Sequence, residues 1–229
     1  MQPKPFFMEF FGTALLTSAI IGAGYMASGT TQDAALGLLI NACAAAAMLS
    51  IIIRMGARVS GAHYNPAVTL AMVLSKKISP LMAFNYVVTQ ILGAIAGAVL
   101  GNAMYGADLI HKSGMERINN VLIISEVVAT AGLVWVVLRF AHKVQSVAVF
   151  APLWIFSAYF FTSSSTFANP AVTIGRVFTQ SPAGISPASL IRFIGAQLIG
   201  ACLGWLLHTY ITEKEVVVEA GSETADPVI

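Results

Sequence analysis

The chain contains the pentapeptide Asn-Pro-Ala-Val-Thr twice, at residues 65–69 and again at residues 169–173. Each copy opens an apolar stretch of roughly ten residues, whereas a helix that crosses a bilayer needs about 20. Asparagine is a favourable helix N-cap and proline suits the first helical turn, so each copy predicts a short helix that begins at its asparagine. One such start is ordinary helix capping, but two matching copies in a chain of 229 residues require a further reason.

The composition points to a bilayer as the surrounding solvent. Hydrophobic residues make up 57% of the chain and charged residues 10%, with a mean hydropathy of +0.81. A soluble domain has about a quarter of its residues charged. Six segments are long and apolar enough to cross a membrane, at residues 6–27, 34–56, 82–104, 120–140, 146–163 and 188–211.

The two short segments occupy matching places, each after the second of three spans. "MEFFGTALL" near the start of the chain is echoed by "SEVVATAGL" in the second half, so that Glu9 matches Glu126. Three crossings in each half force the second half into the membrane upside down. The pattern therefore predicts an all-α membrane protein with six transmembrane helices and two re-entrant half-helices in an inverted repeat.

We expect one domain over residues 1–211, with repeat 1 at about 6–104 and repeat 2 at about 120–211. The acidic segment 212–229 is expected to be a disordered cytoplasmic tail.

Lysine and arginine predict the orientation, because cytoplasmic loops carry more of them. A cytoplasmic N-terminus places eight on the cytoplasmic side and four outside. This predicts a multi-pass protein of the cell membrane with both termini in the cytoplasm. The eight are Lys4, Arg54, Arg58, Lys76, Lys77, Arg139, Lys143 and Lys214; the four are Lys112, Arg117, Arg176 and Arg192.

Two half-helices that enter from opposite sides predict a pore. Non-helical backbone inside a bilayer is tolerated where it is buried in protein or lines a watery cavity, so the loops 56–64 and 164–168 are expected to line one. The positive helix N-termini would meet near the midplane and repel cations, while the amides of Asn65 and Asn169 donate to a passing neutral solute. Such a pore admits small polar molecules and excludes protons.

"SGAHYNPAVT" (60–69) closely resembles the first signature of the aquaporin, or major intrinsic protein, family, and "NPAV" (169–172) stands where the second belongs. The resemblance extends from about Phe6 to Tyr210. It implies a homotetramer with one pore in each subunit and passive two-way flow. It also implies that Glu9 and Glu126 accept hydrogen bonds from the re-entrant loops and that His63 braces its loop. The implied constriction consists of Asn65, Pro66, Ala67, Asn169, Pro170 and Ala171.

The second motif departs from the family at Val172, where an arginine is usual, and Thr173 replaces the aspartate typical of the glycerol-conducting branch. Counting back from the two asparagines without gaps gives a selectivity filter of small residues: Ala45, Ser157, Thr166 and Val172. For the third of these positions, Tyr159 or Phe160 is an alternative to Ser157 because the fifth span is short.

A mouth of small residues predicts a channel wider than a strict water channel. The expected solutes are water with glycerol, urea or undissociated metalloid acids such as arsenite. The alternative is an orthodox water-selective channel that tolerates Val172. Arg176, one turn beyond Val172, is a candidate for the vestibule, where it would attract anions; otherwise it reaches the outer surface or binds a loop carbonyl.

Other functional classes fit less well. An ion-coupled transporter also uses inverted repeats and broken helices, but Glu9 and Glu126 are the only carboxylates within the spans that could bind a coupling ion. No nucleophile–base set or metal-ligand spacing is present, so no enzyme, metal or cofactor is expected. The balanced net charge of +2 gives no reason to expect nucleic acid as a partner.

Overall fold

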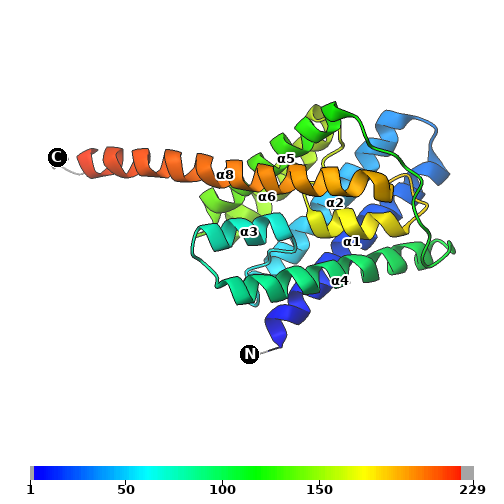
Figure 1. Ribbon diagram of the computed structural model, residues 1–229, viewed down its shortest axis with the longest axis horizontal. Coiled ribbons are helices and arrows are strands. Elements are labelled where there is room, and N and C mark those ends of the chain that lie inside the picture. Colours follow the sequence, from blue (N-terminus) through cyan, green and yellow to red (C-terminus); the bar gives the residue numbers. More distant parts are fainter. Residues whose placement is uncertain (1–2, 223–229) are drawn as a thin grey trace, which may run out of the picture.

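The computed structural model describes residues 3–222. Within this range, six helices are long and apolar enough to cross a membrane, as the sequence predicted (Figure 1). They are α1 (Lys4–Thr30), α2 (Ala34–Gly56), α4 (Pro80–Met104), α5 (Asn120–Phe140), α6 (Val144–Phe161) and α8 (Pro187–Ser222).

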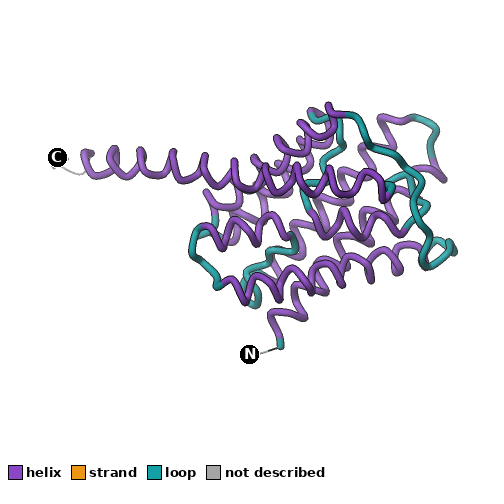
Figure 2. The backbone as a smooth tube through the Cα atoms, viewed as in Figure 1, coloured by secondary structure: helices purple, strands orange, loops and turns teal. Residues whose placement is uncertain are grey.

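Two shorter helices begin at the repeated motifs. They are α3 (Pro66–Leu74) and α7 (Pro170–Gly175), which continues into the single 3₁₀ turn η1 (Arg176–Phe178). The Oδ1 atom of Asn65 accepts a hydrogen bond from the Ala67 amide, and that of Asn169 accepts from the Ala171 amide. Extended loops lead into both helices (Figure 2). The asparagines therefore cap the half-helices as expected.

The two halves of the chain pack in the same way, α1 against α4 and α5 against α8. Glycines make this close approach possible: a Cβ atom at Gly97 would collide with the Ala14 carbonyl oxygen, and one at Gly204 with that of Ala131. Small residues of this kind let membrane helices touch backbone to backbone. The equivalence of these two contacts agrees with an inverted repeat.

The C-terminal segment differs from the sequence prediction. The backbone of α8 continues as a helix to Ser222, where a disordered tail was expected from residue 212. Between residues 212 and 220 the sequence contains no proline or glycine, and glutamate, lysine and alanine favour helix. The prediction for residues 223–229 lies outside the described residues.

Candidate functional site

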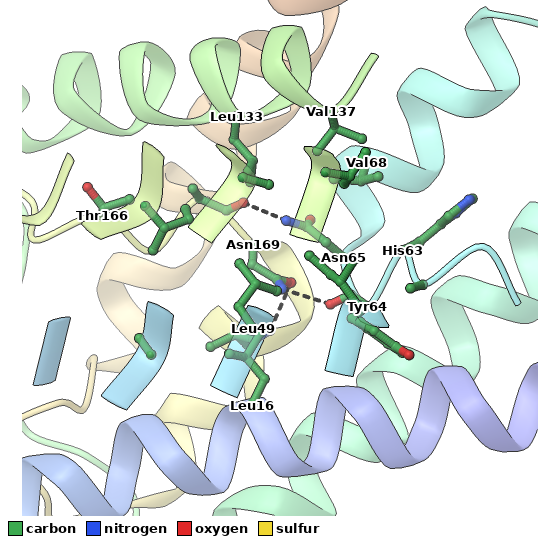
Figure 3. A pocket seen from close by; sticks show the side chains of 18 of the residues that line it. Leu16, Leu49, His63, Tyr64, Asn65, Val68, Leu133, Val137, Thr166 and Asn169 are labelled. Atoms are coloured by element: carbon green, nitrogen blue, oxygen red, sulfur yellow. Dashed lines mark hydrogen bonds between the residues drawn. The ribbon is translucent and has the colours of Figure 1, made fainter. Parts of the chain in front are cut away.

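The two half-helices meet end to end at their asparagines. The Nδ2 atom of Asn65 donates to the Ala168 carbonyl oxygen, and the Nδ2 atom of Asn169 donates to that of Tyr64, both at 2.8 Å (Figure 3). Each side chain therefore caps its own helix and also contacts the loop of the opposite repeat. Since an amide nitrogen carries two hydrogens, one N–H of each asparagine is left for a solute.

The backbone conformation just before each asparagine makes these two hydrogen bonds between the repeats possible. Tyr64 and Ala168, the residues just before the asparagines, have φ values of 50° and 46°. This left-handed conformation is unusual for a residue with a side chain and persists only where the surroundings enforce it. Hydrogen bonds from the backbone N–H groups of both residues to buried glutamates supply that constraint.

Glu9 holds the first loop. Its fully buried carboxylate accepts hydrogen bonds from the Ser60 hydroxyl (2.6 Å), the His63 amide (3.0 Å), the Tyr64 amide (2.6 Å) and the Gln90 side chain (2.7 Å). A carboxylate offers about four acceptor sites, so all of them are in use. This geometry is the loop-bracing role expected of Glu9.

Glu126 does the same for the second loop. It is also fully buried, and it accepts from the amides of Phe167 and Ala168, each at 2.9 Å, and from the Gln197 side chain at 2.7 Å. The two glutamates therefore occupy equivalent places in the two repeats. Both carboxylates are engaged in holding backbone, which disfavours a role in coupling transport to an ion.

His63 lies in the first loop and contributes to bracing it. Its backbone N–H binds Glu9, and its Nδ1 atom lies 3.1 Å from the Thr69 hydroxyl of α3. The imidazole ring packs edge-on against Tyr86, with the ring centroids 5.3 Å apart. The side chain thus links the loop, α3 and α4.

A cavity of about 160 Å³, called here the central cavity, contains the meeting point of the half-helices. Both asparagines lie on its wall, with Thr166 on one side of the pair and His63 on the other (Figure 3). The rest of the wall is mainly apolar and includes Leu16, Ile20, Leu49, Val68, Leu133 and Val137. A neutral solute would therefore find its hydrogen-bond donors concentrated at the asparagines.

A second cavity, of about 350 Å³, lies at the end of the bundle where α1 joins α2. Two arginines, Arg117 and Arg176, contribute to its wall, and it is called here the arginine cavity. Among the described residues, Tyr159 alone lines both cavities. Its phenolic hydroxyl donates to the Oδ1 atom of Asn41 at 3.0 Å, which bridges α6 to α2. The Tyr159 ring therefore stands at the boundary between the cavities.

Three of the four predicted filter residues lie together. Ala45, Thr166 and Val172 are buried and line the central cavity. Ser157 does not: it is exposed on the outside of α6, and the prediction for this position was wrong. Tyr159, one of its two alternatives, takes that place.

The error at Ser157 has a geometric cause. Counting back from Asn169 without a gap goes two residues too far along α6, to Ser157 instead of Tyr159. Two residues correspond to about 200° around a helix, which moves a side chain to the opposite face. Phe160, the other alternative, is 49% exposed and lines neither cavity.

Arg176 is the first residue of η1, directly after α7. It is only 3% exposed, so its side chain does not extend to the surface, and it lines the arginine cavity. Its Nε atom donates to the Ala183 carbonyl oxygen, which is the loop contact considered as an alternative. The guanidinium carbon lies 3.3 Å from the centre of the Phe167 ring.

Arg117 was missed as a candidate site residue. It belongs to the loop between α4 and α5, and from the sequence it counted only as one outside charge. In the structure it shares the arginine cavity with Arg176, and its guanidinium carbon lies 5.1 Å from the centre of the same Phe167 ring. Nothing in the local sequence marks it, since the loop has neither a repeat nor a periodic pattern. Tyr159 and Asn41 meet across 118 positions of sequence and likewise form no local motif.

The family model for major intrinsic proteins matches residues 2–168. The chain belongs to the major intrinsic protein family. The match ends one residue before Asn169, the first residue of the second motif, which contains the unusual Val172. Among the described residues there is no group of three or more His, Cys, Asp or Glu side chains that could hold a metal ion.

Alignments with individual relatives extend over almost the whole chain. It is 37% identical to the aquaglyceroporin AqpS of Rhizobium meliloti over 222 residues, which span 95% of this chain and 94% of that protein. It is 29% identical to aquaporin Z of Bradyrhizobium diazoefficiens, with 98% and 100% covered. The solved structure of the aquaglyceroporin from Plasmodium falciparum superimposes with a TM-score of 0.72 at 19% identity, over 93% of this chain and 96% of that one. This likeness shows that the aquaporin-like fold is shared.

Proposed function

We propose that the protein is a passive channel for water and small uncharged solutes, wider than a strict water channel, with glycerol as the first candidate solute. The observation that carries the proposal is the central cavity, where the two capping asparagines present N–H groups in a mainly apolar wall that includes Val172. A polyol suits such a wall, because its hydroxyls can accept from the amides while its carbons contact the apolar side. The similarity to an aquaglyceroporin supports the same solute class.

Tyr159 modifies the expected width. The filter is not made of four small residues; it combines Ala45, Thr166 and Val172 with one aromatic ring. Glycerol, urea and undissociated arsenite would pass only where the ring leaves room or moves aside. We therefore propose that solute size is selected at Tyr159, opposite small residues, and not by an arginine.

Exclusion of protons and cations follows from the half-helices. Their N-termini meet at the asparagines, and each carries a partial positive charge of about half a unit. Arg176 and Arg117 add full positive charges at one mouth of the pore. A cation would have to pass both groups, whereas a neutral solute meets only hydrogen-bond donors.

Solute flux into proteoliposomes tests the proposal directly. Stopped-flow light scattering with water, glycerol, urea and undissociated arsenite should show facilitated entry of water and at least one larger solute, without dependence on a proton or sodium gradient. An orthodox water channel would conduct water alone. Accumulation of a solute against its gradient when a proton gradient is applied would instead establish a coupled transporter.

We also propose a homotetramer with both termini in the cytoplasm. The tetramer rests on the family resemblance, and native mass spectrometry of the purified protein tests it. The orientation rests on the eight-to-four distribution of basic residues. The start of α1 and the end of α8 lie toward the same end of the bundle (Figure 1), which agrees with six crossings. Protease access to a C-terminal tag in sealed vesicles of known sidedness tests the orientation.

A further inference from the structure

The arginine cavity holds two guanidinium groups at the mouth of the pore. Arg176 is almost fully buried, and Arg117 is half-buried beside it. Both guanidiniums contact the Phe167 ring, with centroid distances of 3.3 Å and 5.1 Å. Contact of this kind with an aromatic ring is attractive and restricts the motion of the cations. The two charged groups are thus held in place in advance of any ligand.

Neither arginine is paired with a carboxylate among the described residues. Arg176 donates through Nε to the Ala183 carbonyl oxygen, and its Nη1 atom is buried without a hydrogen-bond partner. Arg117 donates to the carbonyl oxygens of Gly184 and Pro182, at 3.3 Å and 3.4 Å. Carbonyl groups accept hydrogen bonds but do not cancel charge.

In the part of the chain that the structure describes, Asp33 is the one acidic residue on the wall of this cavity. Its Oδ1 atom accepts from the amides of Ala35 and Leu36 at 2.8 Å and 3.0 Å, so it serves as the N-cap of α2. No ion pair joins it to either arginine in the described part of the chain. The cavity therefore keeps an excess of positive charge together with an unused buried donor.

Guanidinium groups bind carboxylates and phosphates particularly well, because their N–H groups form a fork that matches two oxygen atoms. A buried donor without a partner is costly, so a ligand that accepts from Nη1 of Arg176 removes that cost. We propose that the arginine cavity is a binding site for one small oxyanion, such as a carboxylate or phosphate, held by Arg176 and Arg117.

This oxyanion site has a consequence for transport. The cavity adjoins the central cavity at Tyr159, so a bound anion occupies the space through which a neutral solute must enter. Oxyanions on that side of the membrane then slow neutral-solute flux. This second effect rests on the proposed channel function, whereas anion binding itself does not.

Isothermal titration of the purified full-length protein with acetate and with inorganic phosphate, in a chloride buffer, tests the site. We expect saturable binding of one anion per chain. Arg176→Gln should weaken it on the order of ten-fold or more, since a charge-assisted hydrogen bond is lost. Arg192→Gln is the matched control, because Arg192 is exposed and lies outside the cavity. It should bind as the wild type does.

Arg117→Gln is the second variant, for use if the Arg176 variant fails to fold, and it should weaken binding several-fold. Absence of saturable binding to the wild type overturns the proposal. So does equal weakening by all three substitutions, which would indicate general surface charge and no site.

Glycerol flux in external phosphate then tests the obstruction. Phosphate should slow glycerol entry in the wild type and have much less effect in Arg176→Gln. Binding without any change in flux would refute the obstruction while leaving the site intact. If the wild type shows no glycerol flux even without phosphate, the result counts against the channel function itself.

Discussion

Tyr159 offers the sharpest test of how this pore selects by size. Its ring separates the central cavity from the arginine cavity, and the structure shows one polar contact holding it, the 3.0 Å hydrogen bond to Asn41. Where a glycerol-sized solute passes by moving the ring aside, that bond breaks. A hydrogen bond of this type contributes about 0.5–1.5 kcal/mol net. Tyr159→Phe removes the bond and keeps the ring, so displacement becomes easier by about that amount.

The expected effect on flux follows from this energy. A barrier lower by about 0.5–1.5 kcal/mol corresponds to roughly a two- to ten-fold faster passage. Stopped-flow measurements should therefore show faster glycerol and urea entry through Tyr159→Phe, with water changed less because water can pass beside the ring. Tyr159→Ala, which joins the two cavities, should increase the flux of the larger solutes at least as much.

Controls separate this explanation from general loosening of the fold. Asn41→Ala removes the same hydrogen bond from the other side, together with the bond that Asn41 Nδ2 donates to the Ile20 carbonyl oxygen at 2.8 Å. In the double variant with Tyr159→Phe, the change in flux should therefore be smaller than the sum of the two single effects. Ser157→Ala changes an exposed position on the same helix and should leave flux unchanged. If Tyr159→Ala leaves glycerol and urea flux at the wild-type level, the ring is not the constriction and the reasoning fails.

The other predictions concern the central cavity and its supports. Val172→Arg adds a long cationic side chain to the wall of the central cavity. Glycerol and urea flux should fall several-fold, and water flux much less. A parallel fall in the flux of all three would show that this position does not set the width of the pore. Either oxygen that Glu9→Gln replaces accepts two hydrogen bonds, whereas Glu126→Gln can replace the oxygen that accepts only from the Phe167 amide. Each buried donor left unpaired costs about 1–3 kcal/mol. Thermal unfolding in detergent measures this, and the larger loss should be at Glu9; the opposite order would contradict the bracing argument. Asn65→Ala and Asn169→Ala each remove a cap and a solute donor, costing about 1 kcal/mol of local helix stability. Both should weaken proton exclusion or assembly to a similar extent, and intact proton exclusion with full solute flux in both variants would reduce the motifs to plain helix starts.

The inverted repeat in the sequence was enough to predict the half-helices and the place where they meet. Asn65 and Asn169 could be predicted to cap half-helices and to meet, because each motif carries its own start signal and the odd number of crossings reverses the second copy. The loop-bracing role of Glu9 and Glu126 came from the family resemblance, and their matching places in the two repeats supported it. A buried carboxylate in an apolar helix needs donors, and the nearest helix-free backbone supplies them.

The tertiary structure decided which side chains face one another across the pore. Ser157 and Tyr159 differ by two positions on one helix, yet they point to opposite faces, and the turn that sets the register of α6 has no signal in the sequence. Arg117 joins Arg176 only because a loop without a regular pattern folds back over the mouth. Hydrophobic periodicity and capping signals act within a few residues of the chain. The contacts that place Tyr159 and the two arginines beside this pore join residues far apart in sequence. They form only when the helices have packed.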